Sequence, residues 1–184
     1  VNFQLHFSPI CIDDKYGYDA YDLYDYPRAD GFTILPTLLH PKSRGTVSLS
    51  SSDPKDAPII QPNFLEEKED LNQLVKGGKL VFKIMKDDAL RKHTLRDRLP
   101  FDRDSEESLI EHIKKTLETV YHPVGTCKMG VDSMAVVDPM LKVQGISNLR
   151  VVDASIMPLI VSGNTNAPVY MIAEKAADMI LNNF

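Results

Sequence analysis

The feature that most constrains the fold is a series of apolar and small residues spaced three and four apart between about Glu66 and Asp88. The members of this stripe are Leu71, Leu74, Val75, Gly78, Phe82 and Met85. This spacing places the side chains on one face of an α-helix, so it predicts a helix that packs against another layer through that face. The glycine pair in KGGKL, residues 76–80, falls inside this helical pattern and is not a nucleotide-binding loop.

Two more helices are predicted downstream. Leu109, Ile110, Ile113 and Leu117 form a second apolar stripe, and Asp104 followed by Glu107 predicts a capping box before it. We expect His112 to lie on the solvent flank of that helix.

The sequence from residue 162 onward predicts a turn followed by a final helix, with Thr165 or Asn166 as its N-cap and Pro168 in its first turn.

The first 64 residues favour extended structure, because short alternating apolar runs are separated by proline and glycine. The candidate strands lie in residues 1–12, 31–40 and 45–51, the last two joined by the turn PKSRG. A further short buried strand is predicted in NLRVVDAS, residues 148–155, ending at Asp153. Together these elements predict an α+β fold in which helices cover an antiparallel sheet built from residues 1–64.

Composition excludes some classes of protein. The net charge is −5 and no run of Lys and Arg exceeds two residues, which argues against a dedicated nucleic-acid-binding protein. No apolar run approaches the roughly 18 residues of a membrane span. Cys11 and Cys127 form neither a disulfide framework nor a zinc pattern. The first ten residues carry no targeting signal and resemble a strand entered midway, so we expect the chain to be the C-terminal part of a longer protein.

Residues 13–30 hold five of the seven tyrosines and six aspartates. This segment is interpreted either as an exposed acidic loop or as a lid over a substrate, since tyrosines offer large amphipathic contact areas.

The segment TVYHPVGTCKMG, residues 119–130, places His122 between an aromatic residue and a proline, just before a turn. A histidine in such a place can be a structural residue bonded to the backbone, a metal ligand or a proton acceptor. A zinc site lacks a second close ligand pair, and Cys127 lacks the flanking motif of a cysteine hydrolase. Asp153 could either bind sugar hydroxyls or cap its own turn, and the N-terminus of the final helix could stabilise an anion.

Four segments together resemble the glucose-methanol-choline (GMC) oxidoreductases, FAD-dependent enzymes that oxidise alcohols. They are HPKSRGTVSLSSSDPKDAPIIQPNFL, YHPVGTCKMG, VVDPMLKVQGISNLRVVDASIMP and SGNTNAPVYMIAEKAADMI. The resemblance covers roughly residues 30–182 and is closest to the insect glucose dehydrogenase-like branch. It implies that the substrate is an alcohol or a sugar and that the cofactor is FAD, with no metal.

The resemblance assigns the active-site histidine to His122 and the second catalytic position to Asn164. An imidazole is suited to take the hydroxyl proton near neutral pH, and the Asn164 amide N–H can hold the alkoxide oxygen. The hydride passes to the flavin.

The resemblance also assigns cofactor contacts. Asp153 and Ala154 would contact the ribityl-pyrophosphate side of FAD, and the backbone amides of Thr165 and Asn166 would approach the edge of the flavin.

Residues 1–120 are thus expected to form a substrate-binding lobe, and residues 121–184 the catalytic turn and a segment that completes a missing FAD-binding domain. No G-x-G-x-x-G motif is present, so we expect the chain to be inactive without an N-terminal FAD-binding half.

Two alternatives remain open: a non-catalytic ligand-binding or structural module of the same fold, and a hydrolase or metal enzyme using His122, Cys127 and Asp153. The resemblance to the insect branch allows secretion, and no residue assigns a compartment.

Overall fold

The computed structural model describes residues 2–10, 30–96 and 101–182. The chain forms two compact units. The first contains Val1–Ser43 and Leu65–Glu118, and the second contains Arg44–Phe64 and Thr119–Phe184. A search of the described residues finds no helix with the length and apolar character needed to cross a membrane.

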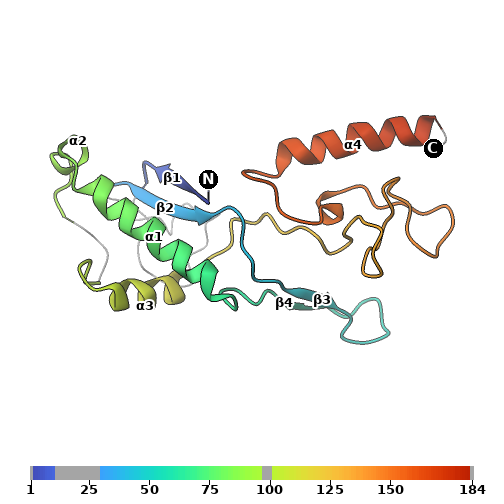
Figure 1. Cartoon of the computed structure of the whole chain (residues 1–184), viewed down its shortest axis with the longest axis horizontal. Helices are drawn as coiled ribbons and strands as arrows, with labels where there is room; N and C mark the ends of the chain where they lie inside the picture. Colours follow the sequence, from blue (N-terminus) through green and yellow to red (C-terminus); the bar gives the residue numbers. More distant parts are fainter. Residues whose placement is uncertain (1, 11–29, 97–100, 183–184) are drawn as a thin grey trace. The chain divides into compact units, whose positions relative to one another are not determined.

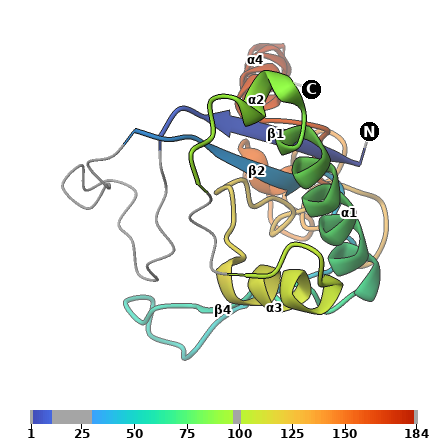
Figure 2. The same cartoon turned by 90° about the vertical axis from the view of Figure 1, so that its left-hand side faces the viewer.

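The first unit is built from a two-stranded ribbon and helices. Strands β1 (Phe3–Ser8) and β2 (Thr33–Leu38) pair antiparallel, in a register that runs from Phe3 opposite Leu38 to Ser8 opposite Thr33. The helices of this unit are α1 (Lys68–Met85), α2 (Asp88–Arg91) and α3 (Glu106–Thr116). Helix α1 packs against both the β1–β2 ribbon and α3 and is drawn between them in Figure 1, while Figure 2 shows it beside both. The helix expected between residues 66 and 88 is therefore confirmed.

Two adjacent glycines let α1 approach both of its neighbours closely. A methyl group added at Gly77 would lie 3.0 Å from Cβ of Pro36 on β2, and one added at Gly78 would lie 3.1 Å from Cδ1 of Leu109 on α3. Leu109 is buried, so the second contact belongs to the core of the unit. The glycines of KGGKL therefore serve helix packing.

A buried carboxylate anchors the segment that follows β2 to the start of α1. Asp70 is 3% exposed and accepts hydrogen bonds from the backbone N–H groups of Lys42 and Ser43, both at 2.8 Å. The Ser43 hydroxyl donates a third bond to the same carboxylate at 2.6 Å. Three donors satisfy a group whose burial would otherwise be costly.

The second unit has little regular structure apart from one hairpin and one long helix. Strands β3 (Thr46–Ser48) and β4 (Ile59–Gln61) pair antiparallel. Helix α4 (Asn166–Leu181) lies along irregular segments that include the 3-10 turn Ala154–Ile156 (Figure 1). The buried cluster beneath it consists of Val137, Leu141, Ile156 and Ala176.

The predicted sheet is corrected in its pairing. The described residues of the segment 1–64 form two separate sheets: β2 pairs with β1, and β3 pairs with β4, so the strands on either side of the PKSRG turn do not pair with each other. Residues 148–155 form no strand but an irregular segment with an isolated bridge at Arg150. The α+β mixture is confirmed.

Two details of α3 also differ from expectation. Its N-cap is Ser105, whose hydroxyl accepts from the N–H of Ser108, in place of the box formed by Asp104 and Glu107. His112 is half-buried and its ring stacks on Phe101 at 4.4 Å, so it does not lie on the solvent flank. The stripe itself was correctly predicted, since Leu109 is buried.

The N-cap of α4 is Thr165, one of the two residues expected there. Cys11 and the tyrosine-rich segment, apart from Asp30, lie outside the described residues.

Replacing Asp70 by Asn should lower the free energy of unfolding by about 2–3 kcal/mol, because the amide presents an N–H group where the carboxylate accepts bonds. Urea unfolding measures this change. The matched control is Asp104→Asn, at an exposed position, which should change stability by less than about 0.5 kcal/mol. Equal effects of the two substitutions would contradict the anchoring role of Asp70.

Candidate functional site

The segment that carries His122 is held against the 3-10 turn by backbone hydrogen bonds. The N–H of Cys127 donates to the carbonyl oxygen of Ser155 at 3.0 Å, and the N–H of Met129 donates to that of Ile156 at 2.8 Å. Ile156 belongs to the buried cluster under α4. The segment therefore has a fixed path that begins only a few residues after His122.

His122 itself is half-buried and its side chain has no hydrogen-bond or ion-pair partner among the described residues. A structural histidine would have one ring nitrogen bonded to the backbone, and that bond is not seen here. Nor do the described residues contain a group of three His, Cys, Asp or Glu side chains that could hold a metal ion. No described residue therefore engages the imidazole nitrogens of His122.

The backbone on both sides of His122 adopts left-handed conformations. Tyr121 has φ of +61° although it is not a glycine, and its side chain is 57% exposed. Gly125 has φ of +90°, which favours glycine. A left-handed residue with a side chain costs roughly 1–2 kcal/mol, and such strain clusters at functional sites. Sequence reasoning identified the Gly125 turn but missed the conformation of Tyr121.

Asp153 caps the 3-10 turn. Its Oδ1 accepts bonds from the N–H of Ser155 at 2.7 Å and from the hydroxyl of Ser155 at 2.5 Å. One of the two open interpretations, a cap on the turn, is thus observed. Both bonds end on Oδ1 of an exposed residue, so the capping role does not use Oδ2. Ala154 is the half-buried first residue of the turn.

The predicted residues near α4 follow one another at its start. Asn164 is exposed and follows Gly163, which has φ of +119°. Thr165 is buried, and its side chain makes no capping bond, while Asn166 is the exposed first residue of the helix. The first turn contains no acidic residue, so the partial positive charge of the helix N-terminus is not neutralised by its own side chains.

The structure brings some of these residues together and leaves others unconnected. The backbone bonds at Ser155 and Ile156 place the His122 segment beside the turn that Asp153 caps. The shared core of Ile156 and Ala176 fixes α4 to the same turn. Among the described residues, no hydrogen bond joins the side chains of His122 and Asn164, although both lie in the second unit.

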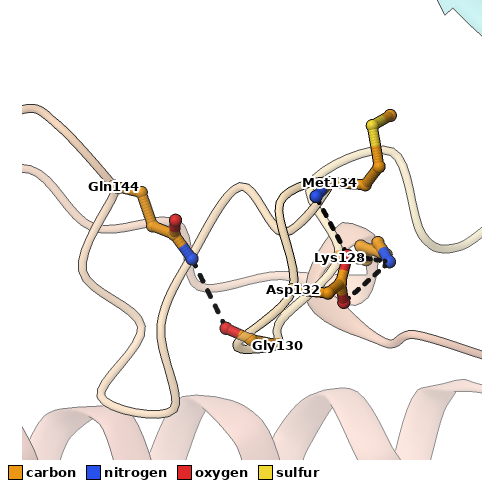
Figure 3. A network of polar contacts seen from close by, with 5 residues as sticks. All are labelled: Lys128, Gly130, Asp132, Met134 and Gln144. Carbon is orange, nitrogen blue, oxygen red and sulfur yellow. Dashed lines mark hydrogen bonds and ion pairs between the residues drawn. The ribbon is translucent and has the colours of Figure 1, made fainter.

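An ion pair that sequence reasoning missed closes the loop after the His122 segment (Figure 3). Lys128 Nζ lies 2.9 Å and 3.0 Å from the two carboxylate oxygens of Asp132, which also accepts from the N–H of Met134. These hydrogen bonds lower the pKa of Asp132, with the bond from Lys128 as the largest cause. The spacing of four residues between a lysine and an aspartate was the signal available in the sequence.

Replacing Lys128 by Met should raise the pKa of Asp132 toward its ordinary range, because the main hydrogen bond to its charged form is lost. A carboxyl-carbon NMR titration follows this residue directly. The control is Lys142→Met, which removes the same charge at an exposed position of the second unit. A pKa that stays low in Lys128→Met would show that Lys128 is not the cause.

The lowered pKa of Asp132 also determines how its contribution to the free energy of unfolding changes with pH. A depressed pKa in the folded state makes Asp132 stabilising above its unfolded pKa, and that contribution is lost as the pH falls through the folded pKa.

A family model described as GMC oxidoreductase matches residues 41–173. The alcohol dehydrogenase (acceptor) of Pseudomonas putida is 44% identical over 181 residues, covering 98% of this chain and 32% of that protein. The choline oxidase of Arthrobacter globiformis is 39% identical over 175 residues, covering 90% of this chain and 32% of the oxidase. The chain thus spans about a third of the length of these relatives.

Solved structures of oxidases match the fold of this chain. Pyridoxine 4-oxidase from Mesorbium loti superposes with a TM-score of 0.77 at 35% identity, covering 84% of this chain and 30% of that one. A formate oxidase of Aspergillus oryzae, from work on its FAD modification, gives a TM-score of 0.83 at 29% identity and covers 99% of this chain and 32% of the oxidase. The assignment to the insect branch stays a prediction. Because the family model matches well over half of its residues, the chain belongs to the GMC oxidoreductase family.

Proposed function

We propose that this chain is the substrate-binding and catalytic portion of an FAD-dependent oxidoreductase that acts on the CH–OH group of an alcohol or sugar. Residues 1–120 form the substrate lobe, and residues 121–184 carry the catalytic turn. The observation that carries the proposal is the His122 imidazole, which is half-buried on a strained and anchored segment without a partner among the described residues. Membership of the GMC family supports it.

The residues at the start of α4 and at the 3-10 turn fit a flavin cofactor. The uncapped helix N-terminus at Thr165 and Asn166 offers backbone N–H groups and partial positive charge, which suit an electron-rich ring edge. The exposed carboxylate of Asp153, with Ala154 beside it, suits the hydroxyl groups of a ribityl chain. Bound FAD supplies the hydride acceptor.

The chain's own side chains would handle the proton and the oxygen of the substrate. His122 accepts the hydroxyl proton on an imidazole nitrogen, which promotes departure of the hydride from carbon. The Asn164 amide donates a hydrogen bond to the substrate oxygen as negative charge develops on it. The turn around Gly125 holds the histidine in place, which limits the entropy lost on reaching the reactive geometry.

We further propose that the C-terminal segment completes the FAD-binding domain of a longer chain. Tyr170 and Leu181 on α4 are 67% and 79% exposed, and Met171 and Ile180 beside them are also exposed. Large apolar side chains on a helix that already buries its other face indicate a second packing partner. That partner would be the N-terminal part that the relatives have and this chain does not cover. Without it we expect no activity.

Replacing His122 by Ala in the full-length, flavin-loaded protein should slow anaerobic bleaching of the flavin by an alcohol by about 10²–10⁴-fold, the usual contribution of a general base. Asn164→Ala should slow it by about 10²–10³-fold, as expected for one lost oxyanion donor. The control is His93→Ala, which removes an exposed histidine and should leave the rate unchanged. If the flavin of His122→Ala is bleached as fast as that of the wild-type protein, the catalytic role of His122 is contradicted and a non-catalytic module is favoured.

A further inference from the structure

The residue before His122 has a backbone conformation that its side chain disfavours. Tyr121 has φ of +61°, in the left-handed region that residues other than glycine seldom adopt, because Cβ there comes too close to a carbonyl oxygen. Glycine or asparagine would adopt this conformation at lower cost. A tyrosine in this place needs an interaction that holds it, and the chain just before it supplies one.

That interaction is a hydrogen bond to the side chain of Thr119. Its Oγ1 accepts from the backbone N–H of Tyr121 at 3.0 Å, a short-range bond of the kind by which Ser and Thr stabilise turns. The direction of the N–H relative to the rest of Tyr121 is set by φ, so this bond restrains the dihedral angle that is positive. Both residues are exposed, so burial in a core does not impose the conformation.

On the other side of His122, the path of the chain is restrained by different means. Pro123 disfavours helical backbone at the residue before it, which is His122. The N–H of Lys128 donates to the carbonyl oxygen of Gly125 at 3.2 Å and closes the turn there. Thr119 is the first residue of this stretch of the second unit. Its bond to Tyr121 thus restrains the chain from the N-terminal side, immediately before the imidazole.

We propose that Thr119 is a positioning residue for His122. Its hydroxyl holds Tyr121 in the left-handed conformation, which sets the direction in which the chain enters His122 and thereby the place of the imidazole. The inference rests on the proposed function, because the placement matters for the reaction only if His122 accepts the substrate proton. A base whose backbone can rotate transfers the proton from only some of its conformations, so the reaction slows as the productive one is depopulated. The role needs no contact of Thr119 with the substrate or the flavin.

The test measures anaerobic flavin bleaching by butan-1-ol, glucose and choline in the full-length, flavin-loaded protein, as a limiting rate per bound flavin. Thr119→Val keeps the shape of the side chain but removes the hydrogen-bond acceptor, and Thr119→Ser keeps the hydroxyl. In Thr119→Val, we expect the limiting rate to fall by about three- to tenfold, the usual worth of one hydrogen bond, at an unchanged half-saturating concentration of alcohol. Thr119→Ser should retain most of the wild-type rate.

The matched control is Thr116→Val. It removes another exposed threonine hydroxyl, one that donates to the backbone oxygen of His112 in the first unit. This variant should bleach at the wild-type rate.

A double-mutant cycle shows whether Thr119 acts through His122. His122→Ala removes the imidazole, so adding Thr119→Val to it should leave the remaining bleaching rate unchanged, because no base is left to position. An equal slowing by Thr119→Val in the presence and in the absence of His122 would show that Thr119 acts elsewhere, and would overturn the inference.

The other outcomes separate this inference from the proposed function. If His122→Ala is slow but Thr119→Val bleaches at the wild-type rate, the inference fails alone. It also fails if Thr119→Ser is as slow as Thr119→Val, or if Thr119→Val changes only the half-saturating concentration. A wild-type flavin that no alcohol bleaches, or an unchanged rate in His122→Ala, overturns the proposed function and this inference together.

Discussion

Two backbone hydrogen bonds, from Cys127 to Ser155 and from Met129 to Ile156, are the interaction on which the second unit depends. They join two segments that have almost no regular structure of their own. Because Ile156 belongs to the same buried cluster as Ala176 of α4, the same contacts join the segment that follows His122, the turn capped by Asp153 and helix α4. The imidazole of His122 can stay without a partner among the described residues because this apolar cluster supplies the stability that holds the adjoining backbone in place.

Much of the secondary structure could be predicted because its causes are local. The spacing of apolar residues placed α1 and α3 correctly, and the turn, N-cap and proline signals placed α4, whose observed N-cap, Thr165, was among those expected. Capping at α3 moved by one residue to Ser105, since neighbouring polar residues compete for the same N–H groups. The pairing of strands was wrong because the partner of β2 lies some thirty residues earlier in the chain, and alternation along a strand says nothing about which strand it meets.

The candidate site likewise has features that the sequence predicts and features that depend on the folded structure. His122, Asn164 and the residues beside them were named from short motifs and a family resemblance, and the structure describes all of them. Their energetic state could not be predicted, because it depends on the surroundings in three dimensions. The absence of a partner for the His122 side chain among the described residues, the left-handed Tyr121 and the buried Nε2 of His6, which also lacks a partner among them, emerge only after folding. Each of these three features lowers the stability of the folded chain locally, and a substitution at that residue would remove the cost if the feature had no use.

The central claim is that His122 takes the proton of an alcohol, and chemical rescue tests it most directly. Free imidazole should restore anaerobic flavin bleaching in His122→Ala of the full-length protein, with a rate that saturates as imidazole occupies the vacated space. It should not restore bleaching in Asn164→Ala, where the proton acceptor is intact and a hydrogen-bond donor is missing. No recovery in His122→Ala at any imidazole concentration, in a variant that still binds flavin and alcohol, would contradict the role of His122 as the base.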